Sequence, residues 1–116
     1  MTVPPEKNPI PDISAEEAEE LTDALLLDVR EADEWAAGHA PTATWIPMGE
    51  LQARIAELPR DRKILAICRS GGRSAAVVEA LHGAGFDAVN VAGGMQSWAR
   101  SGLDVVADDG AAGTII

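Results

Sequence analysis

The chain reads Ile64-Leu65-Ala66-Ile67-Cys68-Arg69-Ser70-Gly71-Gly72-Arg73-Ser74 at the point that decides its fold. The first residues form an apolar run of strand length, and the run leads into a turn that contains two glycines. Ala75-Ala76-Val77-Val78-Glu79-Ala80-Leu81 comes next and predicts a helix over residues 74–82. A buried strand, a glycine turn and a helix in this order are typical of an α/β protein.

Cys68 is the only cysteine of the chain, and it lies between the predicted strand and the predicted helix. Free N–H groups and the positive dipole end at a helix start stabilise a thiolate, which is the nucleophilic form of cysteine. Arg69 and Arg73 lie in the same loop, and residues 62–78 contain no acidic side chain although the net charge of the chain is -10. This pattern predicts a cationic pocket where a reactive cysteine meets a small oxyanion.

A lone cysteine also has a simpler interpretation. Free cysteine is usually a small buried hydrophobic residue, and its packing alone indicates no reactivity. A core cysteine needs neither a glycine turn nor two guanidinium groups in the residues that follow it. The surroundings of Cys68 therefore favour the reactive interpretation over the inert one.

Length and composition limit the possible functions. The 116 residues fit one compact domain, and no apolar stretch approaches the roughly 18 residues of a membrane span. Residues 1–34 hold eleven acidic and two basic residues, a net charge of -9, and the remainder has -1. This acidity argues against nucleic acid or an anionic membrane as partner. The N-terminus lacks a signal-peptide pattern and a reactive thiol survives best in a reducing compartment, so we expect a cytoplasmic protein.

The rest of the chain alternates apolar runs with helical patterns. Residues 1–12, with four prolines, predict an extended arm, and residues 107–116 predict a flexible tail, which leaves 13–106 as the domain. Ser14 and Glu17 match a capping box, so a short helix is expected there. Strands are expected at 25–29, 44–46, 64–67 and 89–91, and further helices at 31–37, 50–58, 74–82 and 94–99.

This alternation predicts an α/β fold with a mostly parallel central sheet and helices on both faces. In such folds ligands bind at the carboxyl ends of the strands. Cys68 directly follows the strand predicted at 64–67. The fold and the chemistry therefore point to the same loop.

Several motifs together resemble the single-domain rhodaneses. They are Asp28-Val29-Arg30-Glu31, Glu34-Trp35, Gly38-His39, Ile46-Pro47, the loop from Cys68 to Ser74, and Gly93-Gly94 with Trp98. The resemblance covers residues 13–106 in the family's order and spacing. It implies a rhodanese-like three-layer fold and a sulfurtransferase. The cysteine of such an enzyme takes a sulfane sulfur from a donor such as thiosulfate, becomes a persulfide, and passes the sulfur to cyanide or to a small or protein thiol.

The resemblance also assigns site residues. Cys68 is the expected nucleophile, the donor is expected to contact Arg69, Ser70, Gly71, Gly72 and Arg73, and Asp28, Arg30 and Ser74 are expected to support the loop. Gly71 and Gly72 would allow a positive-φ backbone whose N–H groups surround an anion. Arg73 would add a fixed cation, whereas Arg69 is either a donor contact or a solvated loop residue. An ionised thiol needs no general base, and no metal or cofactor is expected.

Two alternatives belong to other functional classes. One is a rhodanese-like binding or regulatory module without catalysis, although Cys68 and Arg73 are both intact. The other is a phosphatase or arsenate reductase on the same fold. Cysteine phosphatases place five residues between cysteine and arginine, whereas this loop has four, Arg69 to Gly72. A shorter loop suits a sulfur atom better than a phosphoryl group, and Ile67 stands where those phosphatases have histidine.

Overall fold

One parallel sheet forms the centre of the molecule in the computed structural model, which describes residues 10–116. Its strand order is β1-β5-β4-β2-β3, and every neighbouring pair is parallel. The strands are β1 (Asp12–Ile13), β2 (Leu25–Asp28), β3 (Thr44–Trp45), β4 (Ile64–Ile67) and β5 (Ala88–Val91). Most of the predicted N-terminal arm lies outside the described residues.

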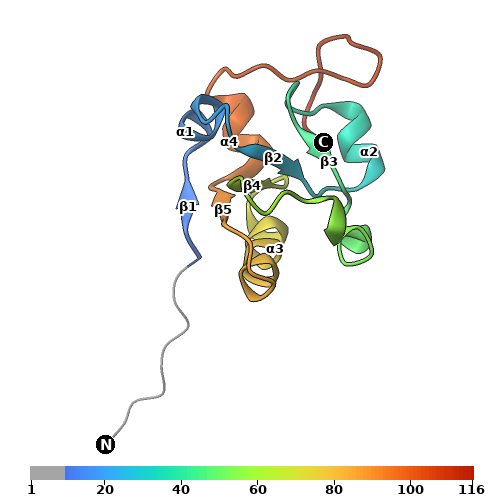
Figure 1. Cartoon of the computed structure of the whole chain (residues 1–116). Coiled ribbons are helices and arrows are strands. Elements are labelled where there is room, and N and C mark those ends of the chain that lie inside the picture. Colours follow the sequence, from blue (N-terminus) through green and yellow to red (C-terminus); the bar gives the residue numbers. More distant parts are fainter. Residues whose placement is uncertain (1–9) are drawn as a thin grey trace, which may run out of the picture.

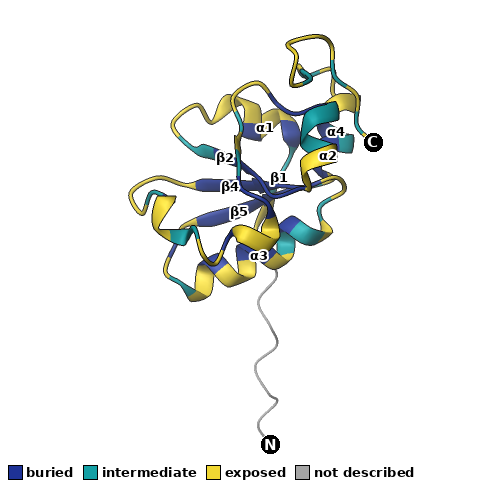
Figure 2. Ribbon diagram, turned by 90° about the vertical axis from the view of Figure 1, so that its right-hand side faces the viewer, coloured by how far each residue is buried: buried dark blue, intermediate teal, exposed yellow. Residues whose placement is uncertain are grey.

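Helices cover both faces of this sheet, as Figures 1 and 2 show. The helices are α1 (Ala15–Glu20), α2 (Ala32–Ala37), α3 (Gly72–Gly83) and α4 (Gly94–Arg100), with short 3-10 helices η1 (Met48–Glu50) and η2 (Ile55–Glu57). Helix α3 packs on one face, and α1 and α4 pack against each other on the opposite face. The predicted three-layer α/β fold is confirmed. No helix among residues 10–116 is both long and apolar enough to cross a membrane.

The two core layers follow from side-chain alternation along the strands. In β4, Ile64 and Ala66 face the α3 side together with Cys68, whereas Leu65 and Ile67 face α1 and α4. Successive side chains of a strand point to opposite faces, so an uninterrupted apolar run is what a strand with a helix on each face requires. This explains why the central strand carries no polar residue.

The helix starts follow local signals in the sequence. Ser14 caps α1, and its side chain and that of Glu17 form the predicted capping box. Helix α2 has a similar reciprocal arrangement between Glu31 and Glu34, and it ends at Gly38. The strands and helices predicted by sequence are present within one or two residues of their expected ends, with the exception of residues 50–58.

Residues 50–58 do not form the predicted helix. They form turns with η1 and η2 at the ends, and Leu51, Ile55 and Leu58 still pack into the core on the α3 side. A segment this short gains little from helix formation itself, so its apolar side chains decide its course and tight 3-10 turns bury them. The sequence did not predict β1, because this strand has only two residues and the first of them, Asp12, was assigned to the N-terminal arm.

The C-terminal segment, residues 103–116, packs on the domain where a flexible tail was predicted for 107–116. Figure 1 shows it leaving α4 and crossing to α2. The Asp108 and Thr114 N–H groups donate to the carbonyls of Ala36 and Ala37 in α2. Val106 also forms an antiparallel bridge with His39. These partners are distant in sequence, and no pattern of residue types in either segment predicts the contacts between them.

Candidate active site

Cys68 lies at the carboxyl edge of the sheet, directly after β4, and is 1% exposed. The loop of residues 68–74 turns at Gly71, which has φ of 108° and is the N-cap of α3. Only glycine adopts this left-handed region readily. Gly72 has no positive φ and is already the first residue of α3, so the conformational prediction is confirmed for Gly71 and wrong for Gly72.

The sulfur of Cys68 accepts hydrogen bonds from two groups of its own loop. The Gly71 N–H lies 3.1 Å from Sγ, and the Ser74 hydroxyl lies 3.2 Å from it. Burial disfavours the thiolate, but donors from Ser74, Gly71 and Ser70 outweigh burial and lower the pKa of the Cys68 thiol. A lowered pKa increases the thiolate fraction near neutral pH, which is the form that attacks sulfur.

The start of α4 holds the other side of the loop. The N–H of Met95 donates to the Cys68 carbonyl at 2.7 Å, and the N–H of Gln96 donates to the Arg69 carbonyl at 3.0 Å. Gly93 and Gly94 both have positive φ, and a side chain at Gly94 would collide with the Cys68 carbonyl. The glycine pair is therefore needed for the close approach of two backbones.

Arg73 forms a bidentate ion pair with Glu34 of α2. The guanidinium Nη1 and Nη2 atoms lie 2.7 and 2.8 Å from the two carboxylate oxygens. The Arg73 hydrogen bonds lower the pKa of Glu34 to about 2. Glu34 raises the pKa of Arg73 above its usual range, and the negative charge of Cys68 adds to this effect. Arg73 therefore interacts with the charge of Cys68, but its own charge is shared with a carboxylate.

Arg69 and Ser70 are exposed. The Arg69 Nε donates to the Ile116 carbonyl at 2.8 Å, so the guanidinium is held by the C-terminal segment. Sequence analysis left Arg69 as either a donor contact or a solvated residue. The structure shows a third arrangement, in which this side chain joins the loop to the end of the chain.

Asp28 and Arg30 form a fully buried ion pair at the end of β2, the strand next to β4. Arg30 also donates to the Gly38 carbonyl at 2.7 Å and to the Glu34 carbonyl at 3.3 Å, both at α2. The pair therefore fixes α2, and α2 carries the carboxylate that holds Arg73. The ion pair therefore supports the active-site loop indirectly, through Glu34 and its contact with Arg73.

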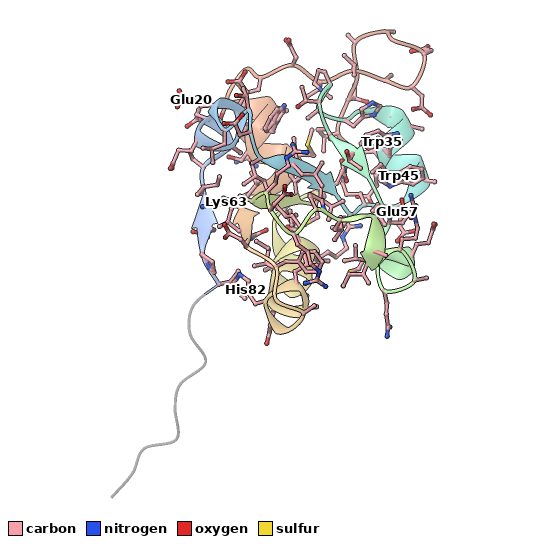
Figure 3. The ribbon with its side chains drawn as sticks, in the orientation of Figure 1. Glu20, Trp35, Trp45, Glu57, Lys63 and His82 are labelled. Carbon is pink, nitrogen blue, oxygen red and sulfur yellow. The ribbon has the colours of Figure 1, made fainter. Side chains whose placement is uncertain are left out.

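Three aromatic rings stack beside α2, where Figure 3 labels Trp35 and Trp45 side by side. The Trp35 ring is parallel to His39 at a centroid distance of 3.6 Å and to Trp45 at 5.7 Å. The His39 Nδ1 pairs with the Trp35 carbonyl at 2.7 Å. These contacts make His39 a packing residue of α2.

Asn90 of β5 is the site residue that sequence analysis missed. It is 6% exposed, donates through Nδ2 to the Gly71 carbonyl at 3.2 Å and accepts from the Ser74 hydroxyl at 2.6 Å. An amide in the apolar strand Ala88–Val91 was the available signal, because a buried polar side chain needs a polar partner.

Comparison with known proteins agrees with this architecture. The family model of the rhodanese-like domain matches residues 14–101. A sulfurtransferase of Allochromatium vinosum is 42% identical over 89 residues, which are 76% of this chain and 83% of the relative. A rhodanese-related protein of Thermoplasma volcanium has a TM-score of 0.78 at 40% identity, covering 83% of this chain and 97% of that one.

A thiosulfate sulfurtransferase of Pseudomonas aeruginosa is a more distant structural neighbour. Its TM-score is 0.77 at 26% identity, and the match covers 92% of this chain and 22% of that one. The range that the family model matches runs from the start of α1 to the end of α4, so it contains the loop between β4 and α3 and the glycine pair before α4. The chain belongs to the rhodanese-like domain family.

Proposed function

We propose that this protein is a sulfurtransferase that moves a sulfane sulfur from a donor such as thiosulfate, through a Cys68 persulfide, to cyanide or a thiol. The observation that carries the proposal is the pair of hydrogen bonds to the Cys68 sulfur from Gly71 and Ser74. They favour a thiolate in a loop that contains neither histidine nor carboxylate. A pre-ionised nucleophile needs no base in its loop.

In the first half-reaction the Cys68 thiolate attacks the outer sulfur of thiosulfate. The bond between the two donor sulfurs breaks, and sulfite leaves with its electron pair. The product is a persulfide whose outer sulfur carries the negative charge. Backbone N–H groups of the loop and the helix start at Gly72 favour an anion at this position.

In the second half-reaction a thiophilic acceptor attacks the outer sulfur. With cyanide the product is thiocyanate, and with a thiol it is a new persulfide. The bond between the two persulfide sulfurs breaks, and Cys68 leaves as a thiolate. The hydrogen bonds that lower the pKa of Cys68 also make it a better leaving group. A reducing compartment such as the cytoplasm would keep this thiol free between cycles.

Mass spectrometry of the intact protein after thiosulfate treatment tests the proposal. We expect a mass gain of one sulfur atom that cyanide removes as thiocyanate. Cys68→Ser is the matched control, because it keeps the size of the side chain and removes the nucleophile. If no sulfane donor gives an adduct, the protein is a binding or regulatory module of the same fold.

The loop length supports sulfur transfer over phosphate chemistry. Four residues separate Cys68 from Arg73, and Arg73 is already paired with Glu34, so a phosphate dianion would compete with a carboxylate for the guanidinium. A small aryl phosphate should therefore be turned over far more slowly than thiosulfate. Comparable rates with the two substrates would favour the phosphatase alternative.

A further inference from the structure

Asn90 lies where an apolar side chain would be expected. Its neighbour Ala88 belongs to the core on the α3 side, whereas Val89 and Val91 face α1 and α4. Alternation along β5 therefore directs the Asn90 side chain to the α3 face, and its amide bonds to Gly71 and Ser74 confirm this. Burying an amide is unfavourable unless both of its ends find partners.

The Ser74 hydroxyl lies within hydrogen-bond distance of two acceptors but has only one hydrogen to donate. Its oxygen lies 2.6 Å from the Asn90 Oδ1 and 3.2 Å from the Cys68 Sγ, and both atoms can accept a hydrogen. A hydroxyl has only one hydrogen to donate. Ser74 is completely buried, and the residues of the two acceptors, Cys68 and Asn90, are only 1% and 6% exposed, so bulk water has little access to the acceptor that loses this hydrogen.

The protonation state of Cys68 decides which acceptor is served. A neutral thiol can donate its own hydrogen to the Ser74 oxygen, and the Ser74 hydrogen then points to Asn90. A thiolate has no hydrogen and carries a charge, and hydrogen bonds to charged acceptors are the stronger ones. The Ser74 hydrogen then turns to the sulfur, and the Asn90 oxygen loses its donor.

Among the described residues, charged groups near the active-site loop come from α3, from α2 and from the end of β2. Arg73 of α3 interacts with the Cys68 charge and is paired with Glu34 of α2. The Asp28–Arg30 pair lies at the end of the adjacent strand β2 and is neutral as a whole. Strand β5 contributes the Asn90 amide and no charged residue. Among the groups that bond to the Ser74 hydroxyl, only the Cys68 sulfur changes its charge, so its ionisation decides the direction of the hydrogen bond.

We propose that Asn90 is a positioning residue that competes with the Cys68 sulfur for the single hydrogen of Ser74. Asn90 holds this hydrogen while the sulfur is neutral and releases it when the sulfur becomes a thiolate. No proton leaves Ser74 in this exchange, and the thiol proton goes to solvent. Through its other end, the Asn90 amide keeps the Gly71 carbonyl in place during the change.

The competition has a consequence for sulfur transfer, which rests on the proposed function. In the persulfide the Cys68 sulfur is bonded to a second sulfur and is neutral, so Asn90 holds the Ser74 hydrogen again. Asn90 therefore favours the two neutral states of this sulfur, thiol and persulfide, over the free thiolate between them.

The test is a titration of the Cys68 thiolate by its ultraviolet absorbance in the reduced protein, without any sulfur donor. Asn90→Val keeps a residue suited to a strand and removes the competing acceptor. We expect the thiolate to form at lower pH, with about threefold more thiolate at a pH well below the wild-type midpoint, because the variant does not lose a hydrogen bond from Ser74 to Asn90 when the thiol ionises. A purely structural role would loosen the Gly71 cradle and shift ionisation to higher pH. An unchanged or raised midpoint overturns the proposal.

The double variant Ser74→Ala with Asn90→Val tests whether the effect runs through the hydroxyl. We expect it to titrate like Ser74→Ala alone, and a further shift in that background overturns the proposal. Val91→Ala is the control, because it loosens the opposite face of the same strand. If Asn90→Val does not fold, Asn90→Ala adds no bulk and takes its place. Since no donor is used, a failure here is distinct from a failure of sulfur transfer.

Discussion

The active-site loop, residues 68–74, and the C-terminal segment, residues 103–116, are both irregular, yet different interactions hold them. The Cys68 sulfur takes its hydrogen bonds from Gly71 and Ser74, only three and six residues away. The C-terminal segment takes its bonds from α2 and from His39, more than sixty residues away. Local bonds leave a readable pattern of residue types, whereas backbone bonds to distant partners do not depend on residue type.

The two arginines of the active-site loop have partners in different parts of the molecule. Arg73 is fixed by Glu34 on α2, and Arg69 is fixed by the Ile116 carbonyl. The carboxylate is a charged partner and the carbonyl a neutral one, so the Arg73 contact is the stronger of the two. Two arginines of one loop are therefore bound by different parts of the molecule.

The largest expected effect is a difference in kcat/KM between the alanine variants of these two arginines. Arg73→Ala should lower kcat/KM for thiosulfate by about a hundredfold, since a fixed charge near a developing anion contributes about 3 kcal/mol. Arg69→Ala should lower it by about threefold or less, because its guanidinium is bound to the C-terminal segment. Steady-state kinetics of the two variants, with thiocyanate as the measured product, provides the comparison.

Equal losses in the two variants would contradict the assignment. Glu34→Gln is the matched control for Arg73, because it keeps the shape of the partner and removes its charge. We expect a smaller loss than with Arg73→Ala, since Arg73 itself remains. Each protein should first be shown to unfold at a similar denaturant concentration, so that kinetics report the site and not the fold.

The next effect concerns the contact between α2 and the C-terminal segment. Gly38 has an extended backbone with φ of 178°, so its glycine is required by space and not by conformation. An added methyl group would collide with the Thr114 backbone and would lie 2.8 Å from the Val105 side chain. Gly38→Ala should therefore lower the free energy of unfolding by about 1–3 kcal/mol, measured in urea.

Gly83→Ala is the control for this substitution. Gly83 is the last residue of α3, and nothing lies within 4 Å of the position that its methyl group would take. Alanine there should stabilise the protein by about 0.5–1 kcal/mol. If Gly38→Ala is as stable as Gly83→Ala, the C-terminal segment is not packed on α2 in solution.

The difference between these segments also explains what the sequence could predict. The strand, the turn at Gly71 and the helix start were predictable because a few neighbouring residues determine each of them. The resemblance to the rhodaneses supplied the glycine pair before α4, and the structure gives its reason in the close approach to the Cys68 carbonyl. The fold and the loop that carries Cys68 could therefore be predicted from the sequence.

The missed contacts are those that join distant segments. Asn90 reaches the loop from β5, Glu34 reaches Arg73 from α2, and Ile116 reaches Arg69 from the end of the chain. A sequence pattern shows that Asn90 and Glu34 are polar, but not which group they face. The failed helix over 50–58 has a related cause, since the core and not the local pattern decides how its apolar residues are buried.

Acid should break the ion pair that joins α2 to the loop. The pKa of Glu34 in the folded protein is lowered from 4.5 to about 2, so its contribution to stability is present above the unfolded pKa. That contribution is lost as the pH falls from 4.5 toward about 2. We expect the wild type to lose stability over this range more steeply than Glu34→Gln. Parallel stability curves for the two proteins would mean that the ion pair contributes nothing in solution.

The smallest expected effect tests whether packing holds the C-terminal segment. Ile115 packs partly buried against the core layer beneath α1 and α4, whereas the neighbouring Ile116 side chain is 50% exposed. Ile115→Ala should lower the free energy of unfolding by about 1 kcal/mol, and Ile116→Ala should change it by less than about half of that. Both variants keep the Ile116 carbonyl that binds Arg69, so both should retain wild-type kcat/KM.

If both isoleucines can be replaced without loss of stability, backbone hydrogen bonds alone hold the segment. If Ile115→Ala instead lowers kcat/KM as well, the segment and the loop act as one unit and the comparison between them fails.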